Sequence, residues 1–133
     1  MPHNPDDMGS AREWIRRARS NLVRAKQPKS EEVFWEDLCF DAQQAVEKAL
    51  KALIIDRRIP FRLVHDIAEL LTLLERDGVR VPGEVRAAVD LTPYAVESRY
   101  PGPAEPVTEE EFRQAVATAE TVVAWAASQI RMT

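Results

Sequence analysis

The sequence predicts an all-α protein, an up-and-down bundle of four to five helices that includes two long helices. Through most of the chain, apolar residues recur every three to four positions, which is the spacing of one face of an α-helix. No segment shows the alternation with a period of two that a half-buried strand requires. Prolines and glycines divide this helical pattern into separate elements.

The first half of the chain predicts two helices. Ser10 and Glu13 form the S-x-x-E pattern of a capping box, which predicts a helix start, and Pro28 ends that helix. The next helix is expected over residues 30–56, because acidic residues follow Ser30 and nothing interrupts the apolar spacing. Such a helix is a rod about 40 Å long, which needs other helices packed along it.

The second half of the chain predicts shorter elements and then a second long helix. A third helix is expected from His65 and Asp66 to the stop signal at Asp77-Gly78. A short fourth helix is expected over residues 84–91, and residues 93–100 could also be helical, with a proline in the first turn.

A proline-rich loop over residues 101–106 then leads into the last helix. Thr108 and Glu111 repeat the capping box, and apolar residues keep helical spacing from there to Ile130. This segment is the second of the two long helices.

Composition limits the class of protein. The 133 residues include 18 Lys+Arg and 22 Asp+Glu, a net charge of −4, which fits one domain over residues 10–133 behind a disordered tail over residues 1–9. There is no apolar run long enough for a membrane helix and no signal peptide, so a soluble, cytoplasmic protein is expected. The acidic balance gives no indication of DNA binding.

Cysteine and histidine usage argues against a metal site. The single cysteine, Cys39, excludes a disulfide framework, and its apolar helical setting predicts a buried structural thiol. With His3 in the tail, only His65 remains as a strong soft-metal ligand, and no glycine-rich phosphate loop occurs. No metal and no cofactor are therefore expected.

Charge is unevenly distributed along the chain. Residues 11–30 hold seven basic side chains and one acid, Glu13, whereas residues 105–120 hold five acids and one base, Arg113. A basic helix could contact a phosphate backbone or an acidic partner surface, or it could be an ordinary solvated face.

The loop between the second and third helices carries the main candidate site. Arg58, Arg62, His65 and Asp66 stand at the start of the third helix, where arginine, histidine and free backbone N–H groups would suit an anion or a phosphate. Histidine is also the usual general acid or base near neutral pH. In the alternative interpretation, His65 caps the helix and the arginines pair with nearby acids.

A second polar cluster lies at Arg99 and Tyr100. Arg99 could bind a phosphate or a carboxylate, and Tyr100 could hydrogen-bond across a cleft. Alternatively, these residues are a helix C-terminus with its expected cation and a packed aromatic ring.

The second helix carries polar side chains interpreted as surface stabilisation. Glu47 and Lys51 form an i,i+4 pair in the favourable order, and Gln43 or Gln44 could lie at a seam between helices or subunits. Four alanines on the same helix would allow close approach of another helix, so part of that face is expected to be a dimer seam: Ala42, Ala45, Ala49 and Ala52.

Several segments together resemble the HEPN domain family over about residues 10–130. The most specific is Cys39 to Leu53, CFDAQQAVEKALKAL, and it is followed in the family's order by His65-Asp66-Ile67, Leu70-Leu71, Arg99-Tyr100-Pro101 and the helix after Thr108. The resemblance implies a helical bundle that usually dimerises, in a small prokaryotic protein commonly encoded beside a minimal nucleotidyltransferase.

The resemblance also implies two kinds of function. Members are proposed to bind nucleotides or to partner that transferase in toxin–antitoxin pairs, and other branches are metal-independent RNases that use an arginine and a histidine. In this chain Arg58 would hold the scissile phosphate and His65 would move a proton. Six residues separate them, and Ile59 stands where those RNases have a polar residue.

The predicted function is a nucleotide-binding and interaction module, acting as a homodimer with a nucleotidyltransferase partner in a toxin–antitoxin-like pair. The first alternative is an RNase toxin that uses Arg58 and His65 on RNA. The second is a structural dimer whose basic first helix meets an acidic partner.

Overall fold

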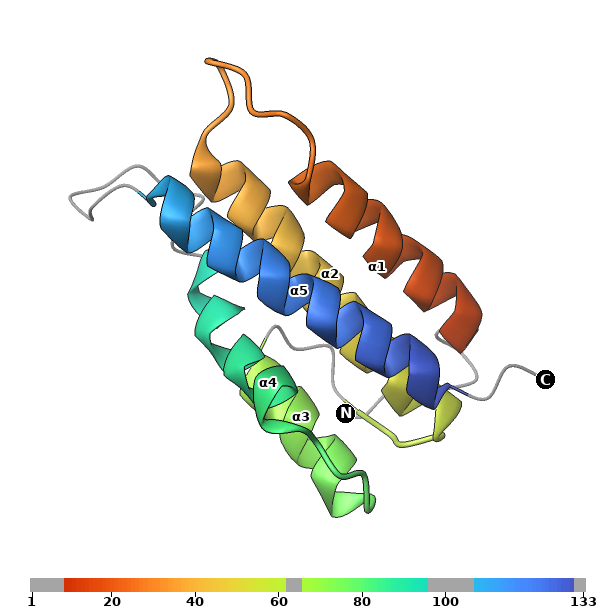
Figure 1. Ribbon diagram of the computed structural model, residues 1–133. Coiled ribbons are helices and arrows are strands. Elements are labelled where there is room, and N and C mark those ends of the chain that lie inside the picture. Colours follow the sequence, from red (N-terminus) through yellow and green to blue (C-terminus); the bar gives the residue numbers. More distant parts are fainter. Residues whose placement is uncertain (1–8, 62–65, 96–106, 131–133) are drawn as a thin grey trace.

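A computed structural model of the chain describes residues 9–61, 66–95 and 107–130. In these ranges it contains helices and no β-strand, which confirms the all-α fold class (Figure 1). The elements are α1 (Ala11–Ala25), α2 (Trp35–Asp56), α3 (Ile67–Arg76), α4 (Gly83–Arg86), the 3₁₀ helix η2 (Ala87–Ala95) and α5 (Glu109–Gln129).

Helix α2 is the centre of the bundle. It lies beside α1 and α5, and α3 and η2 also pack against it (Figure 1). No residue from position 38 to position 55 is exposed. A helix that is buried on every face needs partners all round, and the surrounding elements supply them.

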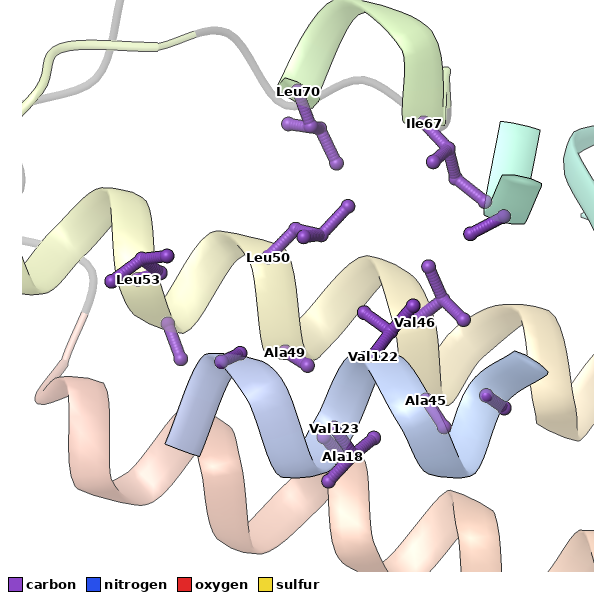
Figure 2. Close-up of a cluster of buried hydrophobic side chains, with 14 of the residues drawn as sticks. Ala18, Ala45, Val46, Ala49, Leu50, Leu53, Ile67, Leu70, Val122 and Val123 are labelled. Atoms are coloured by element: carbon purple, nitrogen blue, oxygen red, sulfur yellow. The ribbon is translucent and has the colours of Figure 1, made fainter. Parts of the chain in front are cut away.

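Small side chains let the three long helices approach closely. Ala18 of α1 faces Val123 of α5, while Ile67 and Leu70 of α3 point toward Val46 and Leu50 of α2 (Figure 2). The expected dimer seam on α2 is wrong, because its four alanines each have an exposed fraction of 0% inside this one chain: Ala42, Ala45, Ala49 and Ala52.

The helices with side-chain caps begin where the sequence predicts. The Ser10 hydroxyl accepts a hydrogen bond from the Glu13 N–H (3.0 Å), and the Thr108 hydroxyl accepts one from the Glu111 N–H (3.1 Å). Asp66 caps α3 in the same manner. These starts depend on residues three positions apart at most, so they can be read locally.

The predicted start of α2 near Ser30 is wrong. The Val33 N–H donates to the Ser30 carbonyl in a turn, and the helix begins at Trp35. The Trp35 ring packs on the Phe112 ring of α5 at 4.7 Å between centroids, and the Glu36 carboxylate accepts from the Val107 N–H (2.9 Å). The Asp37 carboxylate also accepts from the Phe34 N–H (3.2 Å), so a local bond and contacts with a distant segment meet at the start of α2.

The predicted fourth helix is also corrected. Only Gly83–Arg86 is α-helical, and the chain then tightens into the 3₁₀ helix η2 as far as Ala95. Pro93 lies inside η2 and has no N–H to donate, which disfavours a continued α-helix. The remainder of the 93–100 segment and the loop over residues 101–106 lie outside the described residues, as do residues 1–8.

Candidate functional site

Arg58, the predicted phosphate-binding arginine, follows the C-terminal end of α2. It has a positive φ of 59°, the only such value for a non-glycine residue in the described ranges. The Arg58 N–H donates to the Ile55 carbonyl (3.0 Å), and the Ile59 N–H donates to the Ile54 carbonyl (3.1 Å). This pair of bonds is the Schellman motif, in which glycine is the usual residue at the left-handed position.

The chain repeats the motif with glycine at the end of α3. Gly78 has φ 92°, and its N–H and that of Val79 donate to the Glu75 and Leu74 carbonyls at 3.0 Å each. An arginine in the left-handed region costs about 1 to 2 kcal/mol, because Cβ approaches the following carbonyl. The backbone at position 58 therefore favours glycine, and this chain has an arginine there.

The Arg58→Gly variant is expected to raise the free energy of unfolding by about 1 kcal/mol, since it removes the left-handed strain. Urea denaturation followed by circular dichroism would measure the change. Gly78→Ala is the matched control at the same position of the same motif, and it should destabilise the protein. A loss of stability in Arg58→Gly would show that the Arg58 side chain contributes more to folding than its backbone strain removes.

Arg57 fixes the start of the loop that follows α2. Its Nε lies 2.7 Å from Asp77 Oδ2, and its Nη2 donates to the Asp77 carbonyl (3.1 Å). Because Asp77 ends α3, this pair ties together the C-terminal ends of two helices. The backbone at Arg58 therefore follows a residue that this ion pair holds in place.

Asp66 has a definite role at the start of α3. Its Oδ1 accepts from the Ala68 N–H (3.0 Å), which satisfies one of the free donors of the helix N-terminus. Ile67, the next residue, points toward Val46 in the middle of α2 (Figure 2). Arg58, in contrast, lies beyond the end of α2, whose last residue is Asp56. These two candidate residues therefore lie at different levels along α2.

The other predicted site residues lie outside the described ranges. Arg62 and His65 belong to the segment between Phe61 and Asp66, and Arg99 and Tyr100 belong to the segment after Ala95. The site predicted from the sequence is thus represented by Arg58 and Asp66.

A row of buried polar side chains on α2 was not recognised as such from the sequence. Gln43, Glu47 and Lys51 have exposed fractions of 0%, 1% and 5%. The interpretation of Glu47 and Lys51 as surface stabilisation is therefore wrong. Their i,i+4 spacing is the same in a buried pair as in an exposed one, so the spacing alone does not distinguish the two.

The row is linked by polar contacts. Lys51 Nζ lies 3.7 Å from Glu47 Oε1, and the Gln44 amide donates both to Gln43 Oε1 (2.8 Å) and to Glu47 Oε2 (3.2 Å). Lys51 Nζ also lies 5.9 Å from the centre of the Trp14 ring. Burial lowers the pKa of Lys51, and the neighbouring Glu47 carboxylate partly opposes that effect.

One donor in this row has no acceptor. Gln43 Nε2 is buried and, within the described part of the chain, has no hydrogen-bond partner. A buried ion pair and an unsatisfied amide are costly to place in an apolar helix, and such costs concentrate at functional sites. This row can bind a proton or donate a hydrogen bond to an acceptor. Because Ile67 points toward Val46, the start of α3 lies at the same level of α2 as this row.

A second polar contact joins α1 to α2. Asn21 donates to Asp41 Oδ1 (3.0 Å) and accepts from Lys48 Nζ (2.7 Å), and Arg24 lies 3.6 Å from the same Asp41 oxygen. Burial lowers the pKa of Lys48, and the nearby Arg17 adds to this effect. Each group has a partner, so this cluster fixes the register of the two helices.

Cys39 is buried, in agreement with its interpretation as a structural thiol. Burial raises its pKa to about 12, the Glu111 and Glu36 carboxylates add to the rise, and a hydrogen bond with Tyr94 opposes it. Tyr94 also has its pKa raised to about 12, first by burial and then by Cys39. A thiol in this setting stays protonated and is a poor nucleophile.

Two further classes of site are absent from the described ranges. No group of three or more His, Cys, Asp or Glu side chains there is arranged to hold a metal ion. None of the helices in the same ranges combines the length and the apolar character needed to cross a bilayer.

Comparison with known proteins adds to this geometry. The family model of the HEPN domain matches residues 11–130. The crystal structure of TT1696 from Thermus thermophilus is 35% identical, with a TM-score of 0.78, over 90% of this chain and 98% of that one. ST0689, an archaeal HEPN homologue, is 29% identical, with a TM-score of 0.75, over 93% of this chain and 100% of that one. No curated protein matches the sequence.

Proposed function

The chain belongs to the HEPN domain family, and from that premise we propose that it is a cytoplasmic nucleotide-binding and interaction module. It acts as a homodimer and partners a minimal nucleotidyltransferase in a toxin–antitoxin-like pair. The nucleotide phosphates are held by Arg58, with Arg62 and His65 from the segment that follows it and with Arg99 and Tyr100 as further contacts. Asp66, which caps α3, bounds that segment.

The observation that carries this proposal is the backbone of Arg58. A residue kept in the left-handed region, where glycine would be less strained, points to a side chain that is needed for function. Guanidinium is the cation best suited to a phosphate, because its planar fork donates two parallel hydrogen bonds. The tie between Arg57 and Asp77 supports the proposal, since it fixes the point from which Arg58 extends.

Calorimetric titration of the purified protein with ATP, and separately with a short RNA, tests the proposal. Arg58→Ala and His65→Ala are each expected to weaken binding by tenfold or more, about 1.4 kcal/mol. Arg80→Ala is the matched control, because Arg80 is an exposed arginine on another loop. Absence of binding, or equal binding by all four proteins, would contradict a phosphate site at this loop.

One further assay distinguishes the RNase alternative, which uses the same arginine, from the proposed binding module. If the chain is an RNase, it cleaves RNA in the presence of EDTA, and both Arg58→Ala and His65→Ala abolish cleavage. Binding without cleavage supports the module. Co-purification with a nucleotidyltransferase from the native host tests the proposed partner separately.

A further inference from the structure

Two exposed surfaces that follow each other along the chain, one on α1 and one just after it, carry opposite charges. In the part of the chain that the structure describes, the exposed large hydrophobic residues are Val23, with an exposed fraction of 59%, and Phe34, at 67%. Val23 lies on α1 among arginines, and Phe34 lies just before α2 among carboxylates. Each charged surface thus has one apolar side chain in it.

The basic face is defined as Arg12, Arg16, Arg19 and Val23. Their spacing of four, three and four residues places them on one side of α1, and all four are exposed. Arg16 pairs with Glu13 (3.0 Å), whereas Arg12 and Arg19 form no ion pair with any described residue. The row extends for about 17 Å along the helix, and two of its three charges are unneutralised by the residues that the structure describes.

The acidic turn is defined as Glu31, Glu32, Phe34 and Asp37. All four are exposed; Glu31, Glu32 and Phe34 lie in the connection from α1 to α2, and Asp37 lies in the first turn of α2. The Asp37 carboxylate accepts from the Phe34 N–H (3.2 Å), while Glu31 and Glu32 have no cationic partner among the residues described. The connection from α1 to α2, residues 26–34, leaves the end of α1 that carries Val23, so the acidic turn lies at that end of the bundle and Arg12 lies at the opposite end of the basic face (Figure 1).

We infer that the basic face of one copy docks on the acidic turn of a second copy, and that the reverse contact forms at the same time about a twofold axis. This inference rests on the homodimer in the proposed function and identifies its interface. A twofold dimer needs a self-complementary surface, and two adjacent patches of opposite charge provide one. Val23 and Phe34 supply apolar contacts, and the charges of the two patches surround them, as in other protein interfaces.

The same features argue against nucleic acid as the occupant. A phosphate backbone on the basic face would pass beside Glu31 and Glu32, which repel it. The overall charge of −4 acts in the same direction. A second copy can pair with both the basic face and the acidic turn, whereas a polyanion can pair only with the basic face.

A charge-swap experiment tests the interface. The basic-face variant is Arg12→Glu with Arg19→Glu, and the acidic-turn variant is Glu31→Lys with Glu32→Lys. Each alone places like charges opposite each other in a homodimer, so its dimer dissociation constant should rise tenfold or more. When the two variants are mixed in equal amounts, the heterodimer has two favourable contacts. In one, the altered basic face meets the altered acidic turn with the charges exchanged; in the other, the two unaltered surfaces meet as in the wild type. The heterodimer should therefore form in preference to either homodimer. Analytical ultracentrifugation at low salt measures all three samples.

Matched controls separate this effect from net charge. Arg80→Glu and Glu84→Lys change exposed charges away from both surfaces, and they should leave the dimer unchanged. Phe34→Ser keeps every charge and should also weaken the dimer. Because the contact is electrostatic, the wild-type dimer should weaken as NaCl is raised from about 0.05 to about 0.5 M.

The possible failures are distinguishable. A wild-type dimer that is indifferent to both charge-swap variants would overturn this interface and leave the proposed homodimer standing. A wild-type protein that is monomeric at about 100 µM, a concentration at which even weak specific dimers form, would overturn both. Variants that weaken the dimer but are not rescued by mixing would overturn the reciprocal contact between the two patches.

Discussion

Replacing Lys51 by methionine is expected to lower the free energy of unfolding by about 3 to 5 kcal/mol. Methionine keeps most of the side-chain volume, so the loss comes from leaving the Glu47 carboxylate buried without the ammonium group 3.7 Å away. The two side chains have exposed fractions of only 6% and 2%, so water cannot replace the lost partner. Urea denaturation would measure the difference.

The chain contains a matched control with the same spacing. Arg113 and Glu109 form an i,i+4 pair at 3.1 Å on α5, with exposed side-chain fractions of 66% and 53%. Arg113→Met should change stability by no more than about 0.5 kcal/mol, because water screens an exposed pair. The double variant Glu47→Leu, Lys51→Met should recover most of the loss. Equal effects of Lys51→Met and Arg113→Met would contradict the burial of the α2 pair.

Cys39 is expected to resist thiol reagents in the folded protein. A rise in pKa from 9.0 to about 12 reduces the thiolate fraction near neutral pH by about a thousandfold, and the side chain has an exposed fraction of 0%. Labelling with a chromogenic disulfide near neutral pH should therefore be negligible until urea unfolds the chain. Rapid labelling of the native protein would show that the contact of α2 with η2 opens readily.

The same shift predicts lower stability in alkali. A group whose pKa is higher in the folded than in the unfolded state stabilises the fold while the group is protonated. The contribution of Cys39 to stability is therefore complete below pH 9 and is lost between pH 9 and 12. Tyr94 is shifted in the same direction, from 10.0 to about 12. Above pH 9, the urea concentration at the denaturation midpoint should decrease, and it should decrease less steeply in Cys39→Ala. Parallel pH profiles for both proteins would contradict this linkage.

The features that could be predicted from the sequence are those encoded locally. Ser10, Asp66 and Thr108 each cap a helix through a backbone N–H two or three residues away, so short patterns locate three helix starts. Helical spacing predicted the fold class, and the segment from Cys39 to Leu53 indicated the family. Each of these inferences depends on neighbours in the sequence.

The errors concern features that depend on distant residues. Ser30 is the start signal that the sequence offers for α2, whereas the helix begins at Trp35, whose ring packs on the distant Phe112. Glu47 and Lys51 have the spacing of a surface pair, and only the helices around α2 make them buried. In the candidate site, the left-handed conformation of Arg58 could not be predicted, because that position of the motif normally holds glycine.

The central position of α2 has a consequence for the newly made chain. Its contacts come from α1 before it and from α3, η2 and α5 after it, so the core is incomplete until the final helix has been synthesised. Gln129 lies 73 positions after Asp56, which is about 4 to 15 s of translation at ordinary ribosome speed. During that interval the α1–α2 hairpin presents an uncovered apolar strip. Nascent chains stalled before α5 should therefore bind chaperones that full-length chains no longer need.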